Sequence, residues 1–110
     1  MSTPRKDLHN LVAELSFQRK QVVLSSGKES DFYIDGKQTT LHAEGASIIG
    51  RLILEMIRTD PTINGVGGLS MGADPIATAT AVASMQDGGP PIHSFYVRKE
   101  AKGHGTQQYL

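Results

Sequence analysis

The chain has 110 residues with 11 basic and 11 acidic side chains, so its formal net charge is zero. This balance argues against a nucleic-acid-binding surface, which usually needs a basic excess on one face. The absence of cysteine excludes disulfides, thiolate metal sites and a catalytic thiol. Because no apolar run is long enough for a signal peptide or a membrane span, we expect a soluble cytoplasmic protein.

The first half of the chain predicts a helix, two strand-like runs and a second helix. Apolar residues at helical spacing predict a helix over residues 4–16, capped by Thr3. Two β-prone runs follow at residues 22–24 and 32–34, on either side of a Ser-Ser-Gly turn. Residues 43–59 make the strongest predicted helix. Its expected apolar stripe comprises Ala46, Ile49, Leu52, Ile53, Met56 and Ile57.

The second half alternates strands with helices. A buried strand is predicted over residues 63–68, and a helix of small residues over 76–85 with Asp74 as its N-cap. A Gly-Gly-Pro-Pro break precedes a last strand at 92–97. This alternation indicates an α/β fold with parallel neighbours. Because a parallel sheet needs both faces covered, we expect the chain to be the N-terminal part of a longer protein.

Three fixed cations and one imidazole gather in the motif VRKEAKGHG, residues 97–105. They are Arg98, Lys99, Lys102 and His104. Cations on a flexible loop at a strand end suit a phosphate or pyrophosphate group. Taken alone, a solvated charged turn is the more frequent explanation of such a run, so the rest of the chain has to decide.

A glycine-rich loop at residues 65–75 (GVGGLSMGADP) joins a predicted strand to a helix N-terminus. Backbone amides and the helix dipole favour an anion at such a loop. The sequence is neither a dinucleotide fingerprint nor a Walker loop. A simple turn shaped by Gly65 and Gly68 explains the pattern equally well.

Two aromatic residues, Phe32 and Tyr33, follow the Ser-Ser-Gly turn. Their rings suit stacking on a flat heterocycle, although core packing is the more frequent role for aromatic side chains on a strand. The four histidines are His9, His42, His93 and His104. They show no paired ligand spacing, so we expect no zinc site and assign no residue to a metal.

Together these segments resemble the orotate phosphoribosyltransferases along nearly the whole chain. The resemblance lies in the turn Ser26-Gly27, the strand ending Tyr33-Ile34-Asp35, the loop GGLSMGADPIAT and the motif VRKEAKGHG. The Arg-Lys pair followed by Lys-x-His-Gly is its most specific element. It implies an α/β fold of the type I phosphoribosyltransferase kind, a parallel sheet core flanked by helices. Residues 1–40 would form an N-terminal helix and hood segment, and residues 41–110 the first part of the core, truncated at its C-terminus.

The resemblance also implies a role for individual residues. The basic motif, Arg98, Lys99, Lys102 and His104, would bind the diphosphate of phosphoribosyl diphosphate, with Lys102 and His104 as the catalytic pair and Lys102 dominant for rate. Met71, Gly72 and Ser25 would lie at the same ligand. Tyr33 and Ile34 would lie against orotate.

Two departures from the family pattern concern phosphate contacts. Many members carry a lysine at the positions of Ser25 and Gly72, and neither lysine is present here. Lys28 and Lys37 are candidate replacements by their closeness in sequence. The apolar strand with two acidic residues and a Thr/Gly-rich loop, which cradles the ribose 5-phosphate in the family, is also absent.

The implied activity is the transfer of ribose 5-phosphate from phosphoribosyl diphosphate to orotate, with Mg²⁺ as cofactor. The resemblance implies a homodimer in which the basic loop acts in the neighbouring subunit, with no nucleic-acid or membrane partner. By itself this stretch of chain is expected to turn over little. Two alternatives stay open: a non-catalytic phosphoribosyltransferase-like binding or regulatory protein, and an unrelated α/β phosphate-binding module.

Overall fold

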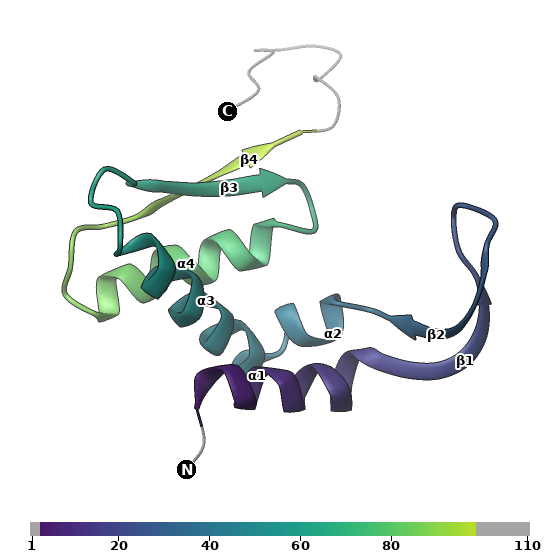
Figure 1. Cartoon of the computed structure of the whole chain (residues 1–110). Helices are drawn as coiled ribbons and strands as arrows, with labels where there is room; N and C mark the ends of the chain where they lie inside the picture. The colour runs from purple at the N-terminus through teal and green to yellow at the C-terminus, as the bar shows by residue number, and fades with distance from the viewer. Residues whose placement is uncertain (1–2, 99–110) are drawn as a thin grey trace.

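The computed structural model describes residues 3–98 (Figure 1). The elements in chain order are α1 (Pro4–Leu11), a π-helical turn η1 (Val12–Ser16), β1 (Phe17–Val23), β2 (Glu29–Ile34), α2 (Lys37–Thr40), α3 (Ala43–Ile57), β3 (Gly65–Leu69), α4 (Asp74–Gln86) and β4 (His93–Val97). In Figure 1, β3 and β4 form one layer, α3 and α4 pack on one face of it, and the β1–β2 hairpin projects to one side. None of the helices in this range has the length and apolar character needed to cross a bilayer.

The N-terminal helix confirms the sequence prediction. The hydroxyl of Thr3 accepts a hydrogen bond from the backbone N–H of Lys6 at 3.2 Å, which caps α1 as expected. The helical stretch continues through η1 to Ser16. There the chain turns directly into β1, which is longer than the three-residue run that its sequence predicts.

The base of the hairpin is held by a buried pair of hydroxyl groups. Ser16 and Thr39 share a hydrogen bond of 2.6 Å, and both side chains are almost fully buried. Thr39 belongs to α2, a one-turn helix that periodicity does not reveal because it is only four residues long. The bond ties β1 and β2 to the helical body, since Asp35 at the end of β2 also donates its backbone N–H to the Ser16 carbonyl.

The buried face of α3 differs from the predicted stripe. Ile48 and Leu54 are buried together with two glycines, whereas Met56 is 57% exposed. The remaining members of the predicted stripe are half-buried, because α3 packs against α1 and α2 as well as α4. Where α3 and α4 approach each other most closely, Gly50 faces the backbone of Ala79 in α4. The position of this small residue, rather than the predicted apolar stripe, therefore determines which side of α3 faces α4.

The sheet of β3 and β4 is parallel, as the alternation of strands and helices predicts. Its register runs from Gly65 opposite His93 to Leu69 opposite Val97. The glycine-rich sequence of β3 has a steric reason, because a Cβ atom at Gly67 would lie about 2.5 Å from atoms of Phe95 on the neighbouring strand.

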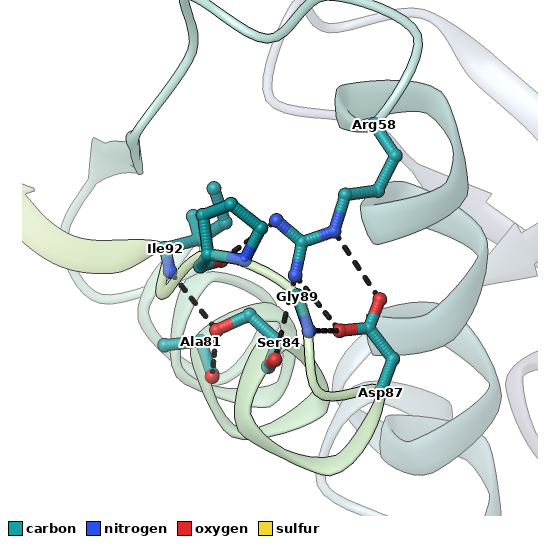
Figure 2. A network of polar contacts seen from close by, with 7 residues as sticks. Arg58, Ala81, Ser84, Asp87, Gly89 and Ile92 are labelled. Carbon is teal, nitrogen blue, oxygen red and sulfur yellow. Dashed lines mark hydrogen bonds and ion pairs between the residues drawn. The ribbon is translucent and has the colours of Figure 1, made fainter.

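The α4–β4 connection is fixed by a polar network around Arg58 at the end of α3 (Figure 2). Its guanidinium donates to both carboxylate oxygens of Asp87, at 2.8 and 3.2 Å, and to the Pro90 carbonyl at 2.7 Å. Beside it, the buried hydroxyl of Ser84 accepts the backbone N–H of Ile92 at 2.9 Å and donates to the Ala81 carbonyl. The network therefore sets where β4 begins.

Replacing Ser84 with alanine should destabilise the fold by about 1–3 kcal/mol, because the buried N–H of Ile92 loses its acceptor. Urea unfolding of the protein that carries this chain, at its full natural length, measures the change. Ser47→Ala removes an exposed hydroxyl from α3 and serves as the control. Equal stability of the two variants would show that the Ser84 bond contributes nothing.

Asp87 predicts a dependence of stability on pH. Its hydrogen bonds from Arg58, and then from the Gly89 amide, hold the pKa of the carboxyl below its usual value. Ionised Asp87 therefore stabilises the folded state above the ordinary carboxyl pKa of about 4, and this contribution is lost as the pH falls through the lower folded-state pKa. We expect Asp87→Asn to lower the free energy of unfolding at neutral pH, and the gap to wild type to close as the pH falls through the lowered folded-state pKa of Asp87. A gap that persists unchanged into acid would contradict this assignment.

Candidate functional site

The carboxyl ends of β3 and β4 bring two predicted site segments to one edge of the sheet. The two strands are parallel and end in register at Leu69 and Val97. The backbone N–H of Ser70 donates to the Val97 carbonyl at 2.9 Å. The loop after β3 thus starts beside Arg98, the first cation of the basic motif. In open α/β sheets this edge is where ligands bind.

The loop between β3 and α4 is held at both ends. The hydroxyl of Ser70 donates to the two carboxylate oxygens of Asp74 at 3.0 Å each, and the Ala73 amide donates to the Leu69 carbonyl at 3.0 Å. The Ser70–Met71 peptide bond is cis. This arrangement corrects the predicted cap: Ala73 is the N-cap of α4, and Asp74 lies in the first turn, because its carboxylate binds the loop rather than a helix amide.

The tip of this loop is open. Met71 is 81% exposed, and a Cβ atom added at Gly72 would meet nothing within 4 Å. Arg98 is exposed at the same edge. Exposed groups at the start of a helix, beside a guanidinium, form an environment that favours an anion. Lys99, Lys102 and His104 lie outside the described residues.

The hairpin holds the other predicted site residues. Tyr33 and Ile34 are 40% and 51% exposed, and as neighbours on β2 they point to opposite faces of the hairpin. Tyr33 lines a pocket together with Ser25, whereas Ile34 is not among its lining residues. The structure therefore brings Tyr33 and Ser25 together and separates Ile34 from them.

The core-packing interpretation of the two aromatic residues is wrong for the described part of the chain. Phe32 is 45% exposed and stacks on Phe17 at 5.7 Å between ring centroids, on the surface of the hairpin. Tyr33 is likewise exposed to solvent. The hairpin and the carboxyl ends of β3 and β4 point toward the same side of the molecule in Figure 1.

Sequence reasoning missed two features of the site. One is the Ser70–Asp74 bond, for which the signal was a hydroxyl and a carboxylate at the two ends of a short glycine-containing loop. The other is Lys20, which lines the hairpin pocket and lies outside every motif. Within residues 3–98, no three His, Cys, Asp or Glu side chains gather as a metal ligand set.

Comparison with known proteins favours one of the open interpretations. No protein-family model matches the chain. An orotate phosphoribosyltransferase from a Nostoc species is 46% identical over 110 residues, all of this chain and 52% of that protein. Over its whole length the chain is therefore similar to orotate phosphoribosyltransferases. This similarity disfavours the interpretation as an unrelated phosphate-binding module.

Solved structures of this family share the fold. The orotate phosphoribosyltransferase of Mycobacterium tuberculosis superimposes with a TM-score of 0.79 at 45% identity, covering 97% of this chain and 58% of that one. The same enzyme in complex with phosphoribosyl diphosphate gives a TM-score of 0.71 at 43% identity, covering 94% and 58%. The predicted type I phosphoribosyltransferase fold is thus confirmed. The chain spans about half the length of the curated relatives that it matches.

Proposed function

We propose that the protein carrying this chain transfers ribose 5-phosphate from phosphoribosyl diphosphate to orotate, yielding orotidine 5'-phosphate and pyrophosphate. The single observation that carries the proposal is the 46% identity to an orotate phosphoribosyltransferase, which extends over all 110 residues. The placement of the loop after β3 next to Arg98 supports it, because this edge is where a phosphate-bearing ligand is expected.

In this reaction the C1–O bond of the ribose breaks, and negative charge builds on the departing pyrophosphate. Fixed cations placed where that charge develops stabilise the transition state. Arg98, Lys99 and Lys102 suit this role, and His104 is proposed to join Lys102 at the reacting groups. Closure of the loop would exclude water and strengthen these interactions.

The two other groups of residues are proposed to position the substrates. Met71 and Gly72 lie at the open tip of the loop after β3, where the backbone can approach the diphosphate. Tyr33 and Ile34 are proposed to contact orotate, and the exposed ring of Tyr33 is available for stacking. Ser25 is proposed to contact phosphoribosyl diphosphate through its hydroxyl.

We propose that Mg²⁺ binds together with the diphosphate of the substrate. When bound, the ion would neutralise charge on the phosphate oxygens. Because the described residues supply no ligand set of their own, we assign no protein ligand and derive no step through the metal. We also propose a cytoplasmic homodimer in which each basic loop acts at the neighbouring site. Residues 1–40 would form the hood of the site and residues 41–110 the first part of its core.

The non-catalytic alternative is not favoured, because the relatives at 42–46% identity over nearly the whole chain carry the enzyme's name. Calorimetry with each substrate, followed by mass spectrometry of the mixture, tests the proposal on the protein at full natural length. Binding of both substrates and formation of orotidine 5'-phosphate are expected. Binding without any product would instead support the non-catalytic alternative.

A further inference from the structure

The hairpin of β1 and β2 carries a pocket with a volume of about 760 Å³, large enough for a small-molecule ligand. Its polar lining consists of Lys20, Ser25, Ser26 and Tyr33, and the remaining lining residues are aliphatic. Lys20 bears the one formal charge among the residues that line it. A lysine beside the two serine hydroxyl groups and the tyrosine hydroxyl is a donor set that suits an anionic oxygen group.

The position of Lys20 follows from an irregularity in the hairpin. The pairing of β1 with β2 shifts register between Arg19 and Val22, so Lys20 lies within a bulge. Bulges break the regular alternation of a strand and redirect its side chains. The Lys20 Nζ atom lies 5.5 Å from the centre of the Tyr33 ring. This cation–π contact restrains a flexible side chain beside the pocket, which lowers the entropy cost of ordering it around a ligand.

Lys28 and Lys37, the candidate replacements for the family lysines absent at Ser25 and Gly72, lie outside this pocket. Neither Lys28 nor Lys37 is among the lining residues of this pocket. Lys37 begins α2, where its backbone N–H donates to the Asp35 carboxylate. Lys28 lies in the turn, where its backbone carbonyl accepts a hydrogen bond from the Leu24 N–H. Lys20 shares the pocket with Ser25, the position at which many family members have a lysine.

We propose that Lys20 binds the diphosphate oxygens of phosphoribosyl diphosphate in the hairpin pocket and thereby replaces the lysine missing at Ser25. This inference rests on the proposed function. A diphosphate is favoured over the carboxylate of orotate, because a multiply charged group gains more from the Lys20 ammonium and the neighbouring hydroxyl donors.

The test is calorimetric titration of the protein at full natural length with phosphoribosyl diphosphate and, separately, with orotate. Lys20→Ala should weaken binding of phosphoribosyl diphosphate by about tenfold or more, since a charged hydrogen-bond partner is lost. Binding of orotate should change by no more than about twofold. Lys20→Arg, which keeps the charge, should restore most of the affinity and shows that the effect is not loss of folding.

Arg19→Ala is the matched control, because it removes one positive charge from the adjacent position of β1. The Arg19 guanidinium lies over Phe17, at 6.0 Å, and is not part of the pocket. Near-wild-type affinity for phosphoribosyl diphosphate in Lys20→Ala, or an equal loss in Arg19→Ala, would overturn the proposal. A loss of affinity for orotate alone in Lys20→Ala would also overturn it. So would a loss of affinity for phosphoribosyl diphosphate in Lys28→Ala but not in Lys20→Ala. If the wild-type protein binds neither substrate, the proposed function fails as well.

Discussion

Lys102→Ala is expected to lower kcat by about 100-fold or more in the protein at full natural length, with little change in Tm. The proposed transition state places growing negative charge on the leaving pyrophosphate, and a fixed ammonium there acts on the transition state more than on the bound substrates. The loss should therefore appear in kcat rather than only in KM. Initial rates of orotidine 5'-phosphate formation and a thermal melt measure the two quantities.

Lys6→Ala is the control for this prediction. Lys6 is an exposed lysine on α1, so its replacement removes the same charge far along the chain from the basic motif. Its kcat should match that of the wild type. A kcat within a few-fold of wild type in Lys102→Ala would contradict the assignment of the basic loop. A large fall in Tm would show instead that Lys102 serves folding.

Gly50→Ala is expected to lower the free energy of unfolding by about 1–3 kcal/mol, although alanine is the better helix former. A Cβ atom at this position would lie 2.5 Å from the carbonyl oxygen of Ala79 and 2.7 Å from its carbonyl carbon. These are backbone atoms, so α4 has to move away from α3. That cost exceeds the gain of about 1 kcal/mol that alanine brings to an isolated helix. Urea unfolding measures the net change.

The matched control is Gly36→Ala, the same substitution at a site where a new Cβ atom meets nothing within 4 Å. The backbone of Gly36 has ordinary helical angles, so alanine fits there without strain. Stability should be unchanged or slightly higher. If Gly50→Ala proved as stable as Gly36→Ala, the close approach of α3 and α4 would not determine the packing of this domain.

Sequence patterns predict the larger elements of this fold because each bears a strong local signal. The helix with Thr3 as its cap and the strand ending at Val97 are both found where the spacing places them. The face of α3 was harder to predict, because it depends on which partner helix can approach Gly50. The cap of α4 was misassigned, since Asp74 binds the Ser70 hydroxyl across the loop, a tertiary contact that local propensity does not contain.

The candidate site likewise has one part that the sequence predicts and one part that it does not. The meeting of the loop after β3 with Arg98 follows from parallel strands, whose carboxyl ends share one edge. The contact of Lys20 with Tyr33 depends on a bulge in the hairpin, and an irregularity of register has no simple sequence signature. The resemblance could name positions that match a motif, but it could not indicate a lysine that lies outside every motif.

The central proposal is that the protein carrying this chain acts as an orotate phosphoribosyltransferase. The most direct measurement supplies the protein at full natural length with Mg²⁺, phosphoribosyl diphosphate and either orotate or uracil, and follows nucleotide and pyrophosphate together. Equal amounts of orotidine 5'-phosphate and pyrophosphate from orotate, with little product from uracil, are predicted. Intact, folded protein that forms no nucleotide from orotate would contradict the account.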